Sequence, residues 1–329
     1  MTTRSGMLTE LPNTDLTVSA LCLGGNRLGS ELDQAASFDL LDTFFDLGGN
    51  FIDTALVYAD WNQGIERSCS ERTIGRWLGA QDRSKLVIAT KGGHPALDNP
   101  GVSRLDRGNL RDDAHRSIEN LGGTPLDLYY LHRDDATRPI AEILETLEEL
   151  VSDGLIRHYA ASNFSAARLT EAAAWATAND VPGFVAHQLE WSLAQPRHDA
   201  VMPDLTWMDE ELLTLHEEQK LTAIPYSSQA RGYFDKALPD QPVPASVHRY
   251  DTVRNASALK TVTEIAHRLD VDKSTVALAG LLQTPLTTVP VIGCRTLEQL
   301  RSSWAALDLD LSAEDRERLA AHAMAGQSS

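Results

Sequence analysis

The chain has 329 residues, which suits one large domain or two ordinary ones, and its 42% hydrophobic and 23% charged residues can form a substantial core. A formal net charge of −18 argues against nucleic acid and against an anionic membrane surface as partners. Its three cysteines are too few and too scattered for a disulfide framework or a zinc cluster, so no metal site is expected.

Residues 1–15 have no apolar core, and so they do not predict a signal peptide. No apolar run approaches the roughly 18 residues that a membrane span needs. We therefore expect a reduced protein in the cytoplasm, without a membrane partner. The sequence leaves a homo-oligomer open.

Apolar segments rich in β-branched and aromatic residues recur along the chain and predict eight strands. They lie at residues 18–24, 50–55, 86–91, 127–132, 156–162, 184–190, 221–227 and 287–293. Segments with helical spacing separate them, among them 34–47 and 140–153. Ser165 is the expected N-cap of a helix that runs to about Asn179.

This alternation of strand and helix predicts a parallel sheet, because each parallel crossover requires a helix. Eight such units close into a (β/α)8 TIM barrel, so we expect an α/β fold with one domain over residues 1–329. A doubly wound open sheet is the alternative. It would need a glycine fingerprint followed by an acidic residue, which LGGNRLGS after the first strand does not provide.

Three long irregular stretches follow predicted strands, at about 92–108, 191–207 and 229–254. In a barrel they belong at the C-terminal rim of the strands, where such enzymes carry their sites. We interpret them as active-site loops, and the last of them as a cover for a cofactor. Residues 311–329 predict only a turn or two of further structure.

Ionisable residues stand at the ends of three neighbouring predicted strands, namely Asp53, Lys91 and His132. Tyr58 follows Asp53 closely enough for its loop to fold back over the barrel mouth. A phenol has a pKa near 10, and a nearby ammonium lowers it toward the working range. Lys91, held by Asp53, would thus make Tyr58 a proton donor, while His132 orients a carbonyl.

Each of these residues also has an ordinary structural interpretation. Asp53 suits an N-cap, Lys91 a rim lysine paired with a surface acid, and His132 a satisfied core or rim histidine. Tyr58 alone would be an amphipathic loop aromatic. Their joint placement at adjacent strand ends favours a site.

Several motifs, in order along the chain, resemble those of the aldo-keto reductases, in particular the bacterial and potassium-channel β-subunit branches. They are LCLGGNRLG (21–29), GGNFIDTALVY (48–58), SERTIG (70–75), VIATKGG (87–93), DLYYLHRDD (127–135) and GLIRHYAASNFS (154–165). The resemblance implies that Asp53, Tyr58, Lys91 and His132 form a catalytic tetrad, with Tyr58 as general acid. It also implies NADP(H)-dependent reduction of an aldehyde or ketone to an alcohol.

The same resemblance implies a set of cofactor-binding residues. These are Gly25, Asn26, Ser162, Asn163, Gln188, Tyr226, Ser227, Gln229, Gly232, Gly293, Arg295 and Gln299. Ser162, Asn163 and Gln188 would hydrogen-bond the carboxamide, and Tyr226 would stack on the nicotinamide. Arg295 would bind the 2′-phosphate, so NADP(H) is expected rather than NAD(H). Many members then have Glu-Asn facing the adenine, where this chain has Ser-Ser at 302–303.

For the substrate pocket we expect Trp61, His94, Arg133 and Trp191. The short C-terminal segment after the last helix favours a small or sugar-like carbonyl over a steroid. Two other functions stay open: a nucleotide-binding regulatory module that senses the cofactor, and a cofactor-free barrel such as an isomerase or lyase.

Overall fold

The computed structural model describes residues 8–238 and 241–324, so residues 239 and 240 of the predicted loop 229–254 and the two ends of the predicted domain lie outside it. Eight parallel strands form its centre in the order β10-β3-β4-β5-β6-β7-β8-β9. They are β3 (Cys22–Gly24), β4 (Phe51–Asp53), β5 (Val87–Gly92), β6 (Leu126–Leu131), β7 (Ile156–Ser162), β8 (Ala186–Gln188), β9 (Thr222–Ala223) and β10 (Val291–Ile292). Each falls within or next to a strand predicted from the sequence.

Backbone hydrogen bonds between β9 and the segment that leads into β10 close the sheet on itself. The Ala223 amide donates to the Thr287 carbonyl at 2.9 Å, and the Val289 amide donates to the Ala223 carbonyl at 2.9 Å. One step further, the Val291 amide donates to the Pro225 carbonyl at 2.8 Å. The predicted (β/α)8 barrel with a single domain is confirmed, and the doubly wound open sheet is excluded.

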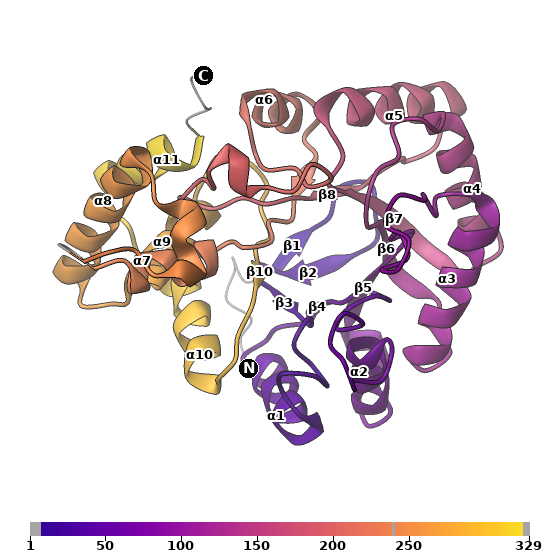
Figure 1. The fold of residues 1–329 in the computed structure, drawn as a ribbon, viewed down its shortest axis with the longest axis horizontal. Helices are drawn as coiled ribbons and strands as arrows, with labels where there is room; N and C mark the ends of the chain where they lie inside the picture. Colours follow the sequence, from indigo (N-terminus) through magenta and orange to yellow (C-terminus); the bar gives the residue numbers. More distant parts are fainter. Residues whose placement is uncertain (1–7, 239–240, 325–329) are drawn as a thin grey trace.

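Helices surround this sheet, as Figure 1 shows. They are α1 (Gln34–Asp46), α2 (Cys69–Leu78), α3 (Arg107–Asn120), α4 (Ile140–Ser152), α5 (Ala166–Asn179), α6 (Glu210–Gln219), α8 (Val253–Leu269), α9 (Lys273–Leu282) and α10 (Leu297–Ala305). The predictions for 34–47 and 140–153 hold to within one residue. Ser165 caps α5 as predicted, since its side chain accepts a hydrogen bond from the Arg168 amide.

The predicted strand 18–24 is in fact two strands. β2 (Thr17–Ser19) pairs antiparallel with β1 (Leu8–Glu10), and the chain bends before β3. The bend is fixed by Ser19, whose hydroxyl donates to the Leu21 carbonyl at 2.7 Å and accepts from the Asn50 amide at 3.1 Å. Sequence periodicity missed this hairpin because the apolar run continues through the bend.

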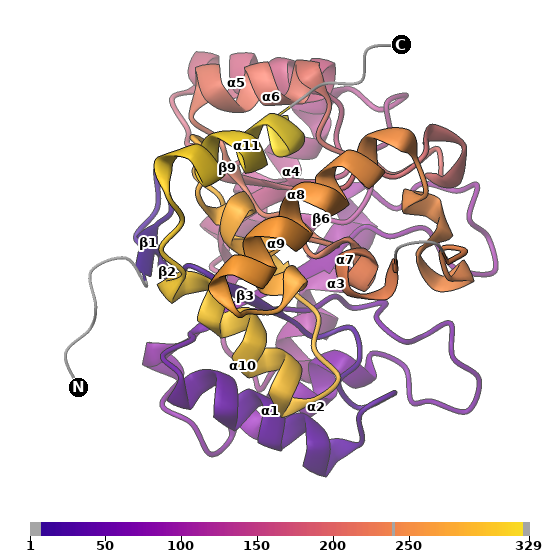
Figure 2. The same ribbon diagram turned by 90° about the vertical axis from the view of Figure 1, so that its left-hand side faces the viewer.

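The hairpin closes one end of the barrel. Leu11, Leu16 and Val18 are buried in the same apolar cluster as the barrel-facing residues Phe51 and Leu128. Figure 2 shows β1 and β2 at one side of the molecule and the long loops at the opposite side. The strands therefore finish on the side of the long loops, opposite the hairpin.

The predicted loops contain more structure than expected. The stretch 191–207 includes a 3-10 helix, η2 (His198–Ala200). The stretch 229–254 includes η3 (Ala230–Gly232), α7 (Tyr233–Lys236) and η4 (Ala245–Tyr250). A further 3-10 helix, η1 (Arg83–Lys85), precedes β5.

The C-terminal segment also differs from the prediction. After η5 (Ala306–Asp308), the chain forms α11 (Ala313–Met324), which packs against α8 and α9. The expected turn or two is thus a helix of 12 residues. Within the described part of the chain, no helix is long and apolar enough to cross a membrane.

Candidate active site

The candidate site follows from the alternation of side chains along the strands. Residues two apart share a face, and the inward positions in the middle of the barrel are apolar. At the next inward position, where the strand ends, the side chain becomes polar on six of the eight strands: on β4, for example, Phe51 is followed by Asp53. The equivalent residues around the barrel are Asp53, Lys91, His132, Ser162, Gln188 and Tyr226. The sheet thus aims six polar side chains at the end where the strands finish.

Lys91 is the centre of the expected tetrad. Its side chain is only 1% exposed, and its ammonium lies 2.7 Å and 2.6 Å from the two carboxylate oxygens of Asp53. It also donates to the Thr54 carbonyl at 2.7 Å and to the Tyr58 hydroxyl at 2.9 Å. A buried ammonium is stable only with such partners. The structure therefore brings Asp53, Lys91 and Tyr58 together as predicted.

The Tyr58 hydroxyl accepts the hydrogen bond from Lys91, which leaves its own proton available. The nearest acceptor for that proton is Asp53 Oδ2, at a long 3.5 Å. The Tyr58 ring also lies edge-on to that of His132, with 5.8 Å between centroids. Tyr58 is thus held by an ammonium and lies beside an imidazole, and its phenol proton makes only a long hydrogen bond to Asp53.

The pKa of Tyr58 differs from the sequence-based expectation. Burial raises this pKa well above its ordinary value, and the nearby Asp53 carboxylate raises it further, while Arg133 acts in the opposite direction. We expected Lys91 to lower this pKa, but burial and the Asp53 carboxylate, which both raise it, dominate. In this structure Tyr58 is therefore a protonated phenol at neutral pH.

Both histidines at the mouth are neutral near pH 7. Burial lowers the pKa of His132 well below its ordinary value, and the cationic Arg133 and Lys91 lower it further. Burial also lowers the pKa of His94, whose Nδ1 lies 2.7 Å from the Pro95 carbonyl. His132 Nδ1 is buried without a hydrogen-bond partner among the described residues. A neutral imidazole beside Tyr58 suits contact with a carbonyl oxygen.

Asn163 joins the ends of β6, β7 and the segment after β9. Its side-chain oxygen accepts from the Tyr226 hydroxyl at 2.8 Å and from the Thr206 amide at 3.2 Å. Its amide nitrogen donates to Ser162 Oγ at 3.1 Å. Asn163 has a left-handed backbone (φ 62°), a conformation that asparagine tolerates well. Ser162 and Asn163, expected at the carboxamide, and Tyr226, expected on the nicotinamide face, thus form one network.

Gln188 has a contact that the sequence did not predict. Its amide nitrogen donates to Asp53 Oδ1 at 2.9 Å, across the barrel mouth. One of its two amide N–H donors is therefore used inside the protein, where it helps to fix the partner of Lys91.

The predicted glycine positions surround the ends of β3 and β10. At Gly25 a Cβ atom would lie 2.9 Å from the Asp53 carbonyl, so this position requires glycine. Gly293 is exposed, and a Cβ there would meet nothing nearer than Arg27 Nη1 at 3.9 Å.

On the adjacent loop Ser227 (φ 52°) and Gly232 (φ 81°) have left-handed backbones. Gln229, between them, lies 3.2 Å from Ser303 Oγ.

Two guanidinium groups meet next to Gly293. Arg295 Nε and Arg27 Nε each lie 3.1 Å from the same oxygen of Glu31. Gln299 accepts the Arg295 amide at 2.8 Å, and Asn26 accepts Arg27 Nη1 at 3.2 Å. The predicted Asn26, Arg295 and Gln299 therefore lie together. The convergence of two arginines on one carboxylate oxygen fits a phosphate group, which makes the same kind of contact.

Of the four expected pocket residues, three lie at the mouth. The ring of Trp61, 54% exposed, lies edge-on to Tyr58 at 6.2 Å, and that of His94 lies 4.8 Å from His132. Arg133 donates to the His132 carbonyl at 2.8 Å and to Asp204 at 2.8 Å.

Trp191 is a correction to the expected pocket. Its side chain is 2% exposed, and its indole N–H donates to the Ala323 carbonyl of α11 at 3.1 Å. Its polar group is directed at the C-terminal helix, so the structure does not place Trp191 with the other three residues at the mouth.

Four residues of this region escaped the sequence analysis: Arg27, Glu31, Glu190 and Asp204. For the first two a signal was present, since Arg27 and Glu31 have the i,i+4 spacing of an ion pair. Glu190 and Asp204 gave no signal, because their partners are Arg249 and Arg133, far away in the chain.

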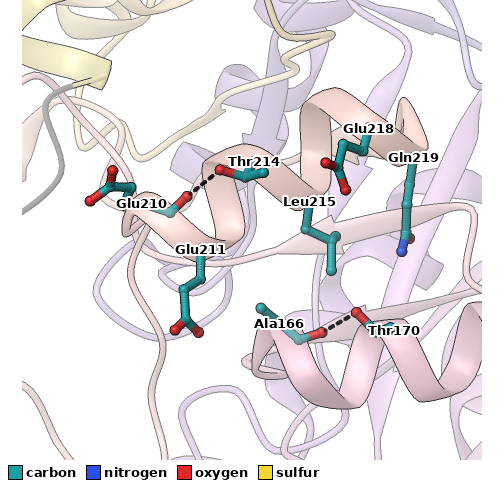
Figure 3. Close-up of a pocket in the computed structure, with 8 residues that line it drawn as sticks. All are labelled: Ala166, Thr170, Glu210, Glu211, Thr214, Leu215, Glu218 and Gln219. Atoms are coloured by element: carbon teal, nitrogen blue, oxygen red, sulfur yellow. Dashed lines mark hydrogen bonds between the residues drawn. The ribbon is translucent and has the colours of Figure 1, made fainter.

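Two hollows on the surface lie away from these residues. One, of about 450 Å³, lies between α5 and α6, where the hydroxyls of Thr170 and Thr214 bond to their own helices (Figure 3). The other, of about 810 Å³, is lined by Asp15, Arg83 and Arg157 among others. Neither contains a tetrad residue. Within the described residues, no three His, Cys, Asp or Glu side chains form a candidate metal site.

Comparison with known proteins places the chain in a family. The aldo/keto reductase family profile matches residues 20–324. An aryl-alcohol dehydrogenase of Pestalotiopsis microspora is 32% identical over 325 residues, which cover 94% of this chain and 79% of that protein. The uncharacterized oxidoreductase YrpG of Bacillus subtilis is 31% identical over 315 residues, covering 93% and 92%.

A solved structure has the same fold. It is a thermostable aldo-keto reductase in complex with the inhibitor epalrestat, and it matches with a TM-score of 0.72 at 23% identity, over 96% of this chain and 99% of that one. The family match over nearly the whole chain and the fold agree. The chain belongs to the aldo/keto reductase family of oxidoreductases.

Proposed function

We propose that this protein is an NADPH-dependent reductase that converts an aldehyde or ketone to an alcohol, with Tyr58 as the proton donor. The observation that carries the proposal is the arrangement around the Tyr58 hydroxyl. It accepts a hydrogen bond from Lys91 at 2.9 Å, while among the described residues its own proton has no acceptor closer than 3.5 Å. That proton is free to be donated to a substrate oxygen at the barrel mouth.

Each residue of the tetrad has a separate role in the proposed reaction. NADPH, when bound, supplies the hydride to the carbonyl carbon. Tyr58 donates its proton to the carbonyl oxygen, and the Lys91 ammonium stabilises the phenolate that remains. Asp53 holds Lys91 in its charged form. Neutral His132 orients the same oxygen by a hydrogen bond from its ring.

The preference for NADPH rests on the arginine pair. Arg27 and Arg295 provide two permanent positive charges beside Gly293, and guanidinium groups bind phosphate oxygens in a bidentate way. Ser162, Asn163 and Tyr226 are the residues that we assign to the nicotinamide end. Gln188 contributes there by fixing Asp53.

For the substrate we favour a small aromatic aldehyde over the sugar-like carbonyl that the sequence also allowed. The rings of Trp61, Tyr58, His132 and His94 stand edge-on to one another in sequence around the mouth. Flat aromatic groups pack well against such an array, whereas a polyol needs hydrogen-bond partners. The name of the Pestalotiopsis relative points to the same class.

The test is a titration of the purified protein with NADPH and NADH, followed by tryptophan fluorescence, and then turnover of benzaldehyde, a short aliphatic aldehyde and an aldose. We expect tighter binding of NADPH and fastest turnover of benzaldehyde. Tyr58→Phe should reduce turnover by about 10²-fold or more while NADPH affinity changes little. Absence of cofactor binding, or full activity of Tyr58→Phe, would refute the proposal.

A further inference from the structure

The loop after β3 places an acidic residue between the two arginines. Glu31 Oε2 lies 3.1 Å from Arg27 Nε and 3.1 Å from Arg295 Nε. Arg27 follows β3 and Arg295 follows β10, which is the neighbour of β3 in the barrel. One carboxylate oxygen of Glu31 therefore bridges the segments that follow β3 and β10, at the place where we assign phosphate binding.

We propose that Glu31 is a selectivity residue, whose carboxylate competes with the 2′-phosphate of the cofactor for Arg27 and Arg295. The inference rests on the proposed function. A 2′-phosphate carries more negative charge than a carboxylate and offers three acceptor oxygens, so it can displace Glu31. A 2′-hydroxyl cannot displace it, but can donate a hydrogen bond to it. Glu31 thus weakens NADPH binding and tolerates NADH.

The guanidinium groups of Arg27 and Arg295 have enough N–H donors to contact their protein partners and a phosphate at the same time. Arg27 Nη1 is used by Asn26, and the Arg295 contact with Gln299 is made by its backbone amide. Each guanidinium has five N–H donors, and so several remain for a phosphate. The competition concerns Arg295 Nε, which donates to Glu31, and the ion pair of Arg27 with the same carboxylate oxygen. Removing the carboxylate leaves both arginines in place for the phosphate.

The expected effect is moderate because the groups are partly in water. The side chains of Glu31 and Arg295 are 51% and 56% exposed, and exposed ion pairs are weak. We expect Glu31→Gln to tighten NADPH binding about three- to tenfold and to leave NADH affinity unchanged or lower. Added salt should reduce the gain, since it screens exposed charges.

The experiment measures binding and not turnover. NADPH and NADH are titrated into the wild type, Glu31→Gln and Glu142→Gln, with tryptophan fluorescence as the signal. Glu142 is a matched control, because it forms the same i,i+4 pair with Arg138 at 3.1 Å with a similar exposure of 56%. The control should bind both cofactors as the wild type does.

The outcomes separate this inference from the proposed function. A gain for NADPH alone in Glu31→Gln supports the selectivity role. An equal gain for both cofactors would mean that Glu31 competes with the diphosphate instead, and would overturn it. Unchanged affinities in Glu31→Gln, with normal binding by the wild type, would overturn it and leave the reductase proposal intact. A wild type that binds neither cofactor would overturn both.

Discussion

Lys91 joins Asp53 and Tyr58, two residues of the tetrad, through a single ammonium group. It contacts Asp53, Thr54 and Tyr58 at 2.6–2.9 Å, and it is almost completely buried. Burial lowers the pKa of this lysine, while Asp53 raises it. The carboxylate thus keeps the ammonium charged in a place that would otherwise favour the neutral amine.

Lys91→Met is expected to reduce turnover by about 10²-fold or more, because the phenolate of Tyr58 loses its only direct cationic partner among the described residues. The pH dependence gives a second measurement. Since the pKa of Tyr58 is raised, carbonyl reduction by the wild type should stay level from neutral pH to about pH 10. Alcohol oxidation needs the phenolate and should rise with pH. In Lys91→Met that rise should move to higher pH.

A suitable control is Lys85→Met, which removes an exposed lysine that is 65% accessible and paired with Asp82. It should keep the wild-type profile. If the rate of alcohol oxidation rises over the same pH range in Lys91→Met as in the wild type, Lys91 does not stabilise the phenolate of Tyr58.

At the scale of residues, the sequence predicted what the strand ends carry but not how these residues pair. Asp53, Lys91 and His132 stand out because charge at the end of an apolar strand is unusual. The bond from Gln188 to Asp53 spans 135 positions, and the pair of Arg295 with Glu31 spans 264. No local pattern contains such distances, and they follow only from the closure of the barrel.

At the scale of elements, a buried ion pair fastens the segment 229–254 to the barrel rim. Glu190, which follows β8 and is 2% exposed, accepts from Arg249 at 3.0 Å and from the Tyr250 hydroxyl at 2.7 Å. Both partners belong to η4. The Arg197 amide also donates to the Arg249 carbonyl at 2.7 Å, so the two long loops are joined.

Glu190→Gln should therefore loosen η4 without unfolding the barrel. A hydrogen bond to a charged group contributes about 2 kcal/mol, which corresponds to roughly 30-fold faster amide exchange in 245–250. Hydrogen–deuterium exchange read by mass spectrometry measures this. Glu264→Gln, which breaks an exposed pair with Arg318 at 2.6 Å, is the control. Equal exchange in 245–250 in both variants would show that Glu190 does not fasten the segment.

Helices and barrel strands were predictable because their signals are local. Periodicity and caps located α1, α4 and α5 to within a residue or two. The hairpin and α11 were missed for different reasons. The hairpin shares an apolar run with β3, and α11 has a weakly apolar sequence that is helical because it packs on α8 and α9.

For the fold as a whole, we expect stability in acid to depend on a buried pair of histidines between β8 and α6. His216 Nδ1 lies 2.8 Å from the Leu221 carbonyl, and its Nε2 lies 3.1 Å from His187 Nδ1. Since a carbonyl only accepts, His216 carries its proton on Nδ1, and His187 donates to it. Burial lowers the pKa of His216 to about 4, and lowers that of His187 well below its ordinary value.

Both rings are thus neutral in the folded protein and protonated when unfolded in acid. Their contribution is fully present above the unfolded pKa of about 6.5 and is lost as the pH falls toward about 4. For His216 alone the shift corresponds to roughly 3 kcal/mol. In urea unfolding at pH 7 and pH 5, His216→Gln should lose less stability on acidification than the wild type. His267→Gln, at an exposed site, should lose as much as the wild type. An equal loss of stability between pH 7 and pH 5 in all three proteins would show that the histidine pair does not cause the sensitivity to acid.

Because the ribosome synthesises the chain from its N-terminus, the barrel can close only after its last strand has been made. β3 begins at Cys22, and its partner on one side is β10, which ends at Ile292. The hairpin packs against Val289 as well as against β4, so the surface on which it docks is also incomplete until the segment that leads into β10 has been synthesised. During synthesis the first strand and the hairpin must therefore wait, with one edge unpaired, for nearly the whole chain to emerge. Premature termination before β10 would release a polypeptide with two exposed sheet edges, a form prone to aggregation.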